Sequence, residues 1–173
     1  EVDYRVDFDP ATGELEATAT VTLRNDAPAS GLPDAVIGSN DQGLPPGTNA
    51  MFFSFYTPHG LRDATLDGAP FGLETQRELG YRVYSRFLEI PPGGERVIEL
   101  HLAGRLAPGS EYRLEIVPQP VPEPDRVTVR LFGARDWIPV AADGLVADPG
   151  AGALVGAYRL TQPARASASY LPR

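Results

Sequence analysis

The chain has 173 residues, of which 42% are hydrophobic and 22% charged, a composition typical of a globular protein rather than a disordered one. Its 23 acids outweigh its 15 cations, all of them arginine, and the resulting net charge of −8 disfavours nucleic acids and anionic membrane surfaces as partners. The absence of cysteine excludes disulfides and thiolate chemistry.

The N-terminal segment predicts a β-hairpin. Apolar and polar residues alternate over Val2–Asp9 and again over Glu14–Arg24, with a Pro-Ala-Thr-Gly turn between the two runs. Such alternation is typical of strands with one buried and one solvated face.

Residues 25–49 are rich in Gly, Pro and Asx and predict a long surface loop. Within it, residues 39–43 (Ser-Asn-Asp-Gln-Gly) offer the oxygen ligands that calcium prefers. The stretch lacks the regular acid spacing of an EF-hand loop, and Asn and Asp are common in turns because their side chains cap them. We therefore expect no metal site and no cofactor.

The middle of the chain predicts further strands at 51–57, 61–66, 81–90 and 95–102, with one helical turn over 74–79. The last two strands are expected to form a hairpin, because only the four residues 91–94 (Pro-Pro-Gly-Gly) lie between them. In this hairpin Val83 and Phe87 are expected to face inward.

The last third shows shorter alternating runs at 112–116, 127–131 and 154–160, and a patternless tail over 162–173. About nine or ten strands and almost no helix predict an all-β, antiparallel β-sandwich with immunoglobulin-like character. We expect one lobe over 1–104, added strands or a small second lobe over 105–161, and an irregular tail over 162–173. The side chains expected in the core are Leu15, Val21, Phe53, Phe87, Leu100 and Val129.

One strand face is a candidate binding surface. Arg82, Tyr84 and Arg86 alternate along a strand and should project together, where they could stack on a sugar or pair with an acidic polymer. They could equally form a solvated outer face paired with Glu95 or Glu99.

No catalytic signature is evident. His59 and His101 lack a companion at metal-ligand spacing, and Asp7 and Asp9 share a strand face beside a turn, where solvation explains them. The sequence therefore predicts a protein that is not an enzyme.

Several sequence segments resemble those of a known family. They are NDAPASGLPDAVIG, GLPPGTNAMFFSFYTPHGLRDATLDG, RELGYRVYSRFLEIPPGGE and YRLEIVPQP with PDRVTVRL. These segments resemble the C-terminal extracellular region of a mostly actinobacterial family, domain of unknown function 4012. The resemblance implies an extracellular location at the cell surface, with membrane contact only through a segment absent from this chain.

These observations together favour a non-enzymatic extracellular β-sandwich module of a bacterial cell-envelope protein. Its role would be structural or would consist of binding an envelope protein or polysaccharide. One alternative is a carbohydrate-binding module that uses the Arg82/Tyr84/Arg86 face, and another is an accessory domain of a hydrolase or transferase.

Overall fold

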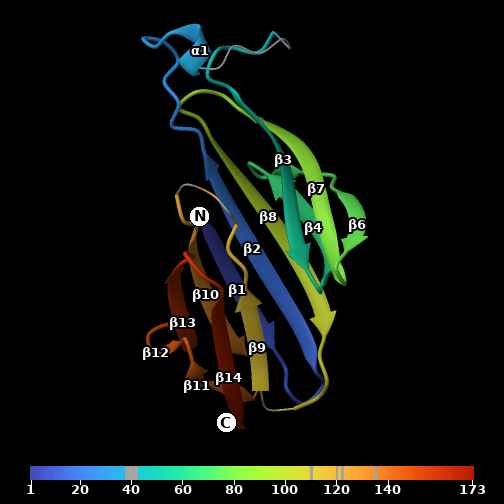
Figure 1. The fold of residues 1–173 in the computed structure, drawn as a ribbon. Helices are drawn as coiled ribbons and strands as arrows, with labels where there is room; N and C mark the ends of the chain where they lie inside the picture. Colours follow the sequence, from blue (N-terminus) through green and yellow to red (C-terminus); the bar gives the residue numbers. More distant parts are fainter. Residues whose placement is uncertain (38–42, 110, 120, 122, 135) are drawn as a thin grey trace. The chain divides into compact units, whose positions relative to one another are not determined.

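The computed structural model describes residues 1–37, 43–109, 111–119, 121, 123–134 and 136–173, and this part of the chain is dominated by strands (Figure 1). The elements are β1 (Val2–Phe8), β2 (Glu14–Arg24), α1 (Asp34–Ile37), β3 (Asn49–Thr57), β4 (Gly60–Leu66), β5 (Ala69–Pro70), β6 (Glu74–Glu78), β7 (Tyr81–Ile90), β8 (Glu95–Arg105), β9 (Glu111–Ile116), β10 (Arg126–Gly133), β11 (Trp137–Asp143), β12 (Val146–Asp148), β13 (Ala153–Arg159) and β14 (Ala164–Pro172). The prediction of a β-rich fold is confirmed. No helix in the described residues has the length and apolar character needed to cross a membrane.

The strands form one mixed sheet and two small ones. The large sheet has the order β12-β13-β10-β1-β2-β8-β4-β5, and the small sheets have the orders β11-β14-β9 and β3-β7-β6. Strand β1 pairs antiparallel with β2 but parallel with β10. The prediction of an antiparallel, immunoglobulin-like sandwich is therefore wrong. Alternation of side chains identifies a strand, but it carries no information about a neighbour that lies more than a hundred residues away in the sequence.

The N-terminal hairpin is confirmed. Strands β1 and β2 pair antiparallel from Val2 opposite Val21 to Phe8 opposite Leu15. Phe8, Leu15 and Val21 are buried, as one-sided burial of an alternating hairpin requires.

Three other local expectations are wrong. Strands β7 and β8 do not form a hairpin, because β7 lies between β3 and β6 whereas β8 lies between β2 and β4. Residues 74–78 form strand β6 rather than a helical turn, and the expected irregular tail contains strand β14. The tail is ordered by pairing with β9 and β11, and residues 74–78 pair with the next strand, β7, so strand pairing overrides a weak local preference.

The chain divides into two compact units whose segments interleave along the sequence. The first unit comprises 1–21, 59–62 and 99–173, and the second comprises 22–58 and 63–98. In the first unit the ring of Phe8 lies 5.8 Å from that of Tyr112 and 5.3 Å from that of Tyr170, so these rings pack β1 onto β9 and β14. In the second unit, the buried side chains include Phe53, Tyr84, Leu88, Ile90 and Ile98.

Candidate functional site

The three residues predicted to form a binding surface share one face of β7, on which Arg86 is exposed but Tyr84 is buried. Tyr84 is 3% exposed and shares this face with the buried Leu88 and Ile90. Arg86 donates from Nη1 to the carbonyl oxygen of Gly72 at 2.8 Å, and Arg82 is half-buried. The ring of Tyr84 is therefore not available as a stacking platform.

The expectation that Val83 and Phe87 both face inward is only partly correct, because Val83 is buried but Phe87 is not. Phe87, expected in the core, is 48% exposed, whereas Phe53 and the other expected core residues are buried. Those other residues are Leu15, Val21, Leu100 and Val129. Strand β7 carries apolar side chains on both faces, so its alternation defines two faces without indicating which one packs against the core.

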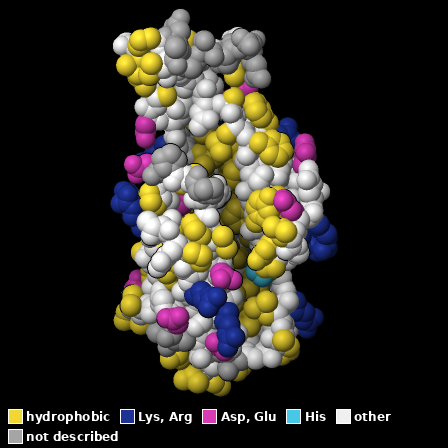
Figure 2. All heavy atoms as spheres, in the orientation of Figure 1, with side chains coloured by type: hydrophobic (Ala, Val, Ile, Leu, Met, Phe, Trp, Pro, Cys, Tyr) yellow, Lys and Arg dark blue, Asp and Glu magenta, His cyan; other side chains and the backbone are white. Residues whose placement is uncertain are grey.

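The outward face of the β3-β7-β6 sheet carries four exposed aromatic side chains, which we call the aromatic face. Phe52 is 56% exposed, Tyr56 49%, Tyr81 41% and Phe87 48%. Phe52 lies directly opposite Phe87 in the antiparallel register of β3 and β7, so the two rings share this face. Figure 2 shows hydrophobic side chains at the surface in the region of β3 and β7, with acidic side chains among them. Of these four residues only Phe87 was given a place from the sequence, and that place was the core.

Polar contacts order the same face. The hydroxyls of Ser54 and Ser85 lie 2.9 Å apart, two residue pairs along from Phe52 and Phe87 and so on the same face. The Tyr56 hydroxyl donates to Oε2 of Glu78 at 2.7 Å, a bond that spans β7. This bond to the carboxylate raises the pKa of Tyr56, because the phenol would lose its acceptor partner on ionisation.

Every charged side chain on this face of the three strands is a carboxylate. By strand register and alternation, Glu74, Glu78 and Glu89 lie on the side of the aromatic face, and we call them the acidic rim. Arg77 and Arg82 lie opposite one another on the other side of the sheet. The charged side chains around the aromatic face are therefore all negative.

The remaining candidates from the sequence have structural roles or fall outside the described part. Asp9 is buried and accepts a hydrogen bond from the amide of Ala11, while Asp7 pairs with Arg5 at 3.1 Å. The described residues contain no group of three His, Asp or Glu side chains that could hold a metal ion. Residues 39–42 of the suggested calcium loop lie outside the described residues.

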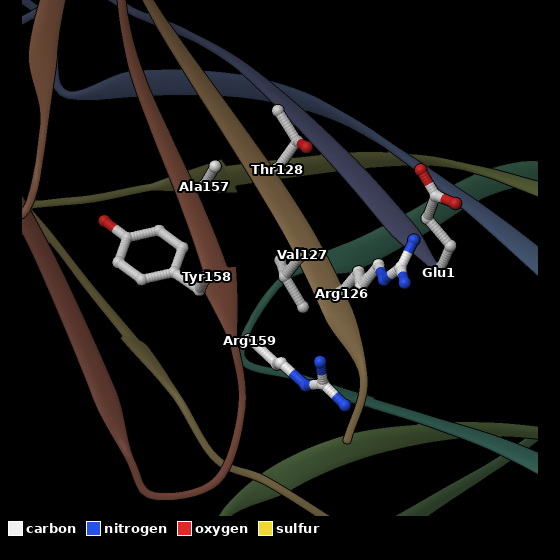
Figure 3. Close-up of a pocket in the computed structure, with 7 residues that line it drawn as sticks. All are labelled: Glu1, Arg126, Val127, Thr128, Ala157, Tyr158 and Arg159. Atoms are coloured by element: carbon white, nitrogen blue, oxygen red, sulfur yellow. The ribbon is translucent and has the colours of Figure 1, made fainter. Parts of the chain in front are cut away.

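A pocket of about 350 Å³ lies over β10 and β13 in the first unit (Figure 3). Arg126 and Arg159 line it and lie directly opposite each other in the register of these strands. Glu1 also lines the pocket, and Glu123 lies 3.7 Å from Arg159. The carboxylates of Glu1, in the lining, and of Glu123, outside it, partly offset the charge of the two guanidinium groups.

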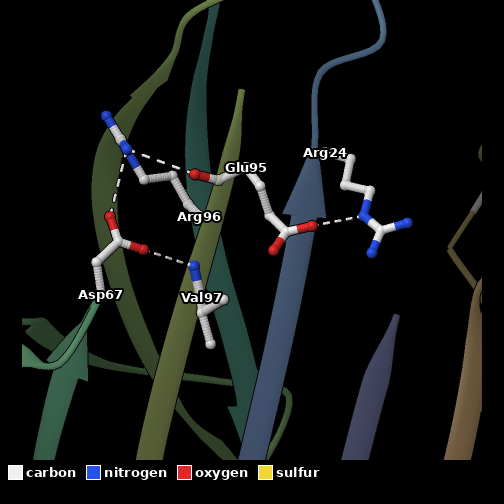
Figure 4. Close-up of polar contacts among 5 residues, drawn as sticks. All are labelled: Arg24, Asp67, Glu95, Arg96 and Val97. Atoms are coloured by element: carbon white, nitrogen blue, oxygen red, sulfur yellow. Dashed lines mark hydrogen bonds and ion pairs between the residues drawn. The ribbon is translucent and has the colours of Figure 1, made fainter. Parts of the chain in front are cut away.

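Two hairpin turns of the second unit both have positive φ at their two central residues but differ in sequence. Asp67-Gly68 and Leu79-Gly80 both have positive φ at both positions, 51° and 80° in the first and 50° and 87° in the second. Asp67 suits such a turn and uses its carboxylate to accept a hydrogen bond from the Val97 amide and to pair with Arg96 (Figure 4). Leu79 is 86% exposed, although leucine is disfavoured at positive φ.

No protein-family model and no curated protein matches this chain. Among solved structures, yeast LTA4 hydrolase in complex with bestatin is similar over 97% of this chain and 28% of its own, with 10% identity and a TM-score of 0.52. An M1 zinc metallopeptidase variant from Deinococcus radiodurans matches 97% of this chain and 41% of its own, with 11% identity and a TM-score of 0.47. At such identity the first likeness is evidence about the fold alone. This chain thus spans about a quarter of the length of that yeast hydrolase.

Proposed function

We propose that this chain is a non-catalytic β-rich module that docks onto another protein domain through its aromatic face. The observation that carries this proposal is the exposure of Phe52, Tyr56, Tyr81 and Phe87, at 41–56%, on one face of a single sheet. Aromatic side chains are enriched at the centres of protein interfaces, where they contribute much of the binding energy. A partner that covers this face would remove these rings from water.

The same geometry weighs against the carbohydrate-binding alternative on the Arg82/Tyr84/Arg86 surface. Sugar recognition on that surface would need an accessible Tyr84 ring, and this ring is 3% exposed. Arg86 is also engaged, because it bonds to Gly72 and lies 5.7 Å from the ring of Phe71.

The similarity in fold to yeast LTA4 hydrolase supports the proposal that this module is part of a larger protein. A unit of similar fold makes up 28% of the chain of yeast LTA4 hydrolase, so a fold of this kind occurs as one part of a longer chain. We extend this organisation, and not the hydrolase activity, to the present protein. The location in the cell envelope stays a prediction.

Site-specific photo-crosslinking in cells that produce the native protein tests the docking proposal. Benzoylphenylalanine replaces Phe52 on the aromatic face or, as a control, Val146 on β12, which is 70% exposed. We expect one dominant crosslinked product from position 52, identified by mass spectrometry down to the attached segment, and no such product from position 146.

The added substitution Phe87→Ser should abolish the product from position 52, because it removes the ring directly opposite. Equal crosslinking from positions 52 and 146, or a product indifferent to Phe87→Ser, would refute docking through this face.

A further inference from the structure

We infer that the partner presents arginine or lysine side chains, set among apolar ones, to the aromatic face. This inference rests on the docking function proposed above and specifies the chemistry of the partner surface. It is carried by the juxtaposition of four exposed aromatic rings with a rim made only of carboxylates.

The acidic rim is open to new ion pairs. Glu74 and Glu89 make no side-chain hydrogen bond or ion pair within the described residues. Glu78 accepts from the Tyr56 hydroxyl through Oε2, which leaves Oε1 able to accept a second donor. Cations placed here would find no competing arginine on the same face of the sheet.

The rings suit the same cations. A guanidinium or ammonium group over an aromatic face is attracted by the electrons of the ring, and arginine also stacks on it through its planar group. This chain already uses the contact elsewhere, since the guanidinium carbon of Arg5 lies 3.9 Å from the centre of the Phe132 ring. The exposed Phe52 and Phe87 offer equivalent surfaces that no arginine of the described residues is seen to cover.

Charge disfavours other occupants of this surface. A second copy docked face to face would bring one acidic rim against another, and like charges in close juxtaposition cost binding energy. An anionic membrane or a nucleic acid would meet the same repulsion, on a chain whose net charge is −8.

Leu79 adds an apolar contact beside this surface. It lies in the turn that joins β6 to β7, next to Tyr81, and it holds a positive φ that asparagine or glycine would adopt at lower cost. The other turn with two positive φ values has Asp67 at the equivalent position. A large, exposed apolar side chain at a strained position is consistent with a contribution to binding rather than to folding.

The test uses the purified chain and two short probe peptides. One alternates arginine with leucine, and the other replaces each arginine by citrulline, which keeps the shape and removes the charge. Because any cationic peptide is attracted to an acidic protein, each rim substitution is paired with one of equal charge elsewhere. Glu89→Gln on the rim is compared with Glu14→Gln at the exposed start of β2.

We expect calorimetry to show the arginine peptide binding about tenfold more tightly than the citrulline peptide, with affinity falling as salt rises. Phe52→Ser and Glu89→Gln should each weaken binding, whereas Glu14→Gln should not. Leu79→Asn should weaken binding while the melting temperature stays the same or rises, which a general disruption of the fold would not produce. The segment crosslinked from position 52 should contain arginine or lysine.

Equal binding of both peptides, equal weakening by Glu89→Gln and Glu14→Gln, or no binding at all would overturn the inference. The proposed docking function would survive these results if position 52 still crosslinks to one partner segment in a manner that depends on Phe87. An uncharged or acidic captured segment would then identify a different partner chemistry. Self-association of the chain that is lost in Phe52→Ser would identify a second copy as the occupant and would also overturn the inference.

Discussion

Asn25, just after β2, makes three side-chain hydrogen bonds to the backbone. Its side chain is buried and donates from Nδ2 to the carbonyl oxygens of Gly47 and Ile90, both at 2.8 Å. Its Oδ1 accepts from the amide of Ala27 at 3.1 Å. One amide thus joins the start and the end of the long 25–49 segment to the end of β7.

We predict that Asn25→Ala lowers the free energy of unfolding by about 3 kcal/mol. The substitution leaves two buried carbonyl groups without their donor, and each orphaned group costs about 1–3 kcal/mol. Because the lower end of that range applies where water can enter, we take about 1.5 kcal/mol for each. The melting temperature should fall by about 6–12 °C for a chain of this length.

Urea unfolding followed by far-ultraviolet circular dichroism measures this loss, since that signal reports on strands throughout the chain. Asp26→Asn is the matched control, because Asp26 is exposed and adjacent, and its substitution should change stability by less than about 0.5 kcal/mol. Asn25→Asp should be worse than Asn25→Ala at neutral pH, because a carboxylate cannot donate to either carbonyl. A loss below about 1 kcal/mol for Asn25→Ala would refute the proposed role of these hydrogen bonds.

Three further predictions follow from the second unit's sheet faces and from the turn between β3 and β4. Phe53→Ala should cost about 3–5 kcal/mol in urea unfolding and Phe87→Ala less than about 1, because only Phe53 is buried; the reverse order would restore the sequence-based assignment of faces. Gly104→Ala should cost about 1–3 kcal/mol, because a Cβ atom there would lie 2.3 Å from Nδ1 of His59; an unchanged melting temperature would contradict this close packing. Burial lowers the pKa of His59 in the folded chain, so as the pH falls the imidazole is protonated in the unfolded chain before it is protonated in the folded one. Stability should therefore fall as the pH drops from about 7.5 to 5.5. His59→Gln should reduce that pH dependence, measured as the difference in unfolding free energy, and an identical slope in the variant would show that His59 does not contribute to it.

The aromatic face could not be located from the sequence. From the sequence, Phe53 and Phe87 were expected in the core, and nothing distinguished Phe52 as an exposed residue. Exposure could not be read from them, because the register that sets Phe52 opposite Phe87 joins two strands that are not consecutive in the chain. The acidic rim required the further knowledge that residues 74–78 form a strand beside β7.

The sequence by itself determined the β-rich character, the acidic surface and the N-terminal hairpin, because each depends on composition or on contacts between neighbouring segments. It also identified one buried face of β2, where all the apolar side chains lie on a single side. Only the tertiary structure decided that β1 lies parallel to β10 and that Tyr84 rather than Phe87 faces inward. The physical reason is the same in both cases, because the partner of a strand and its buried face depend on which distant segments pack against it. An alternating pattern with apolar residues on both sides is compatible with burial of either face.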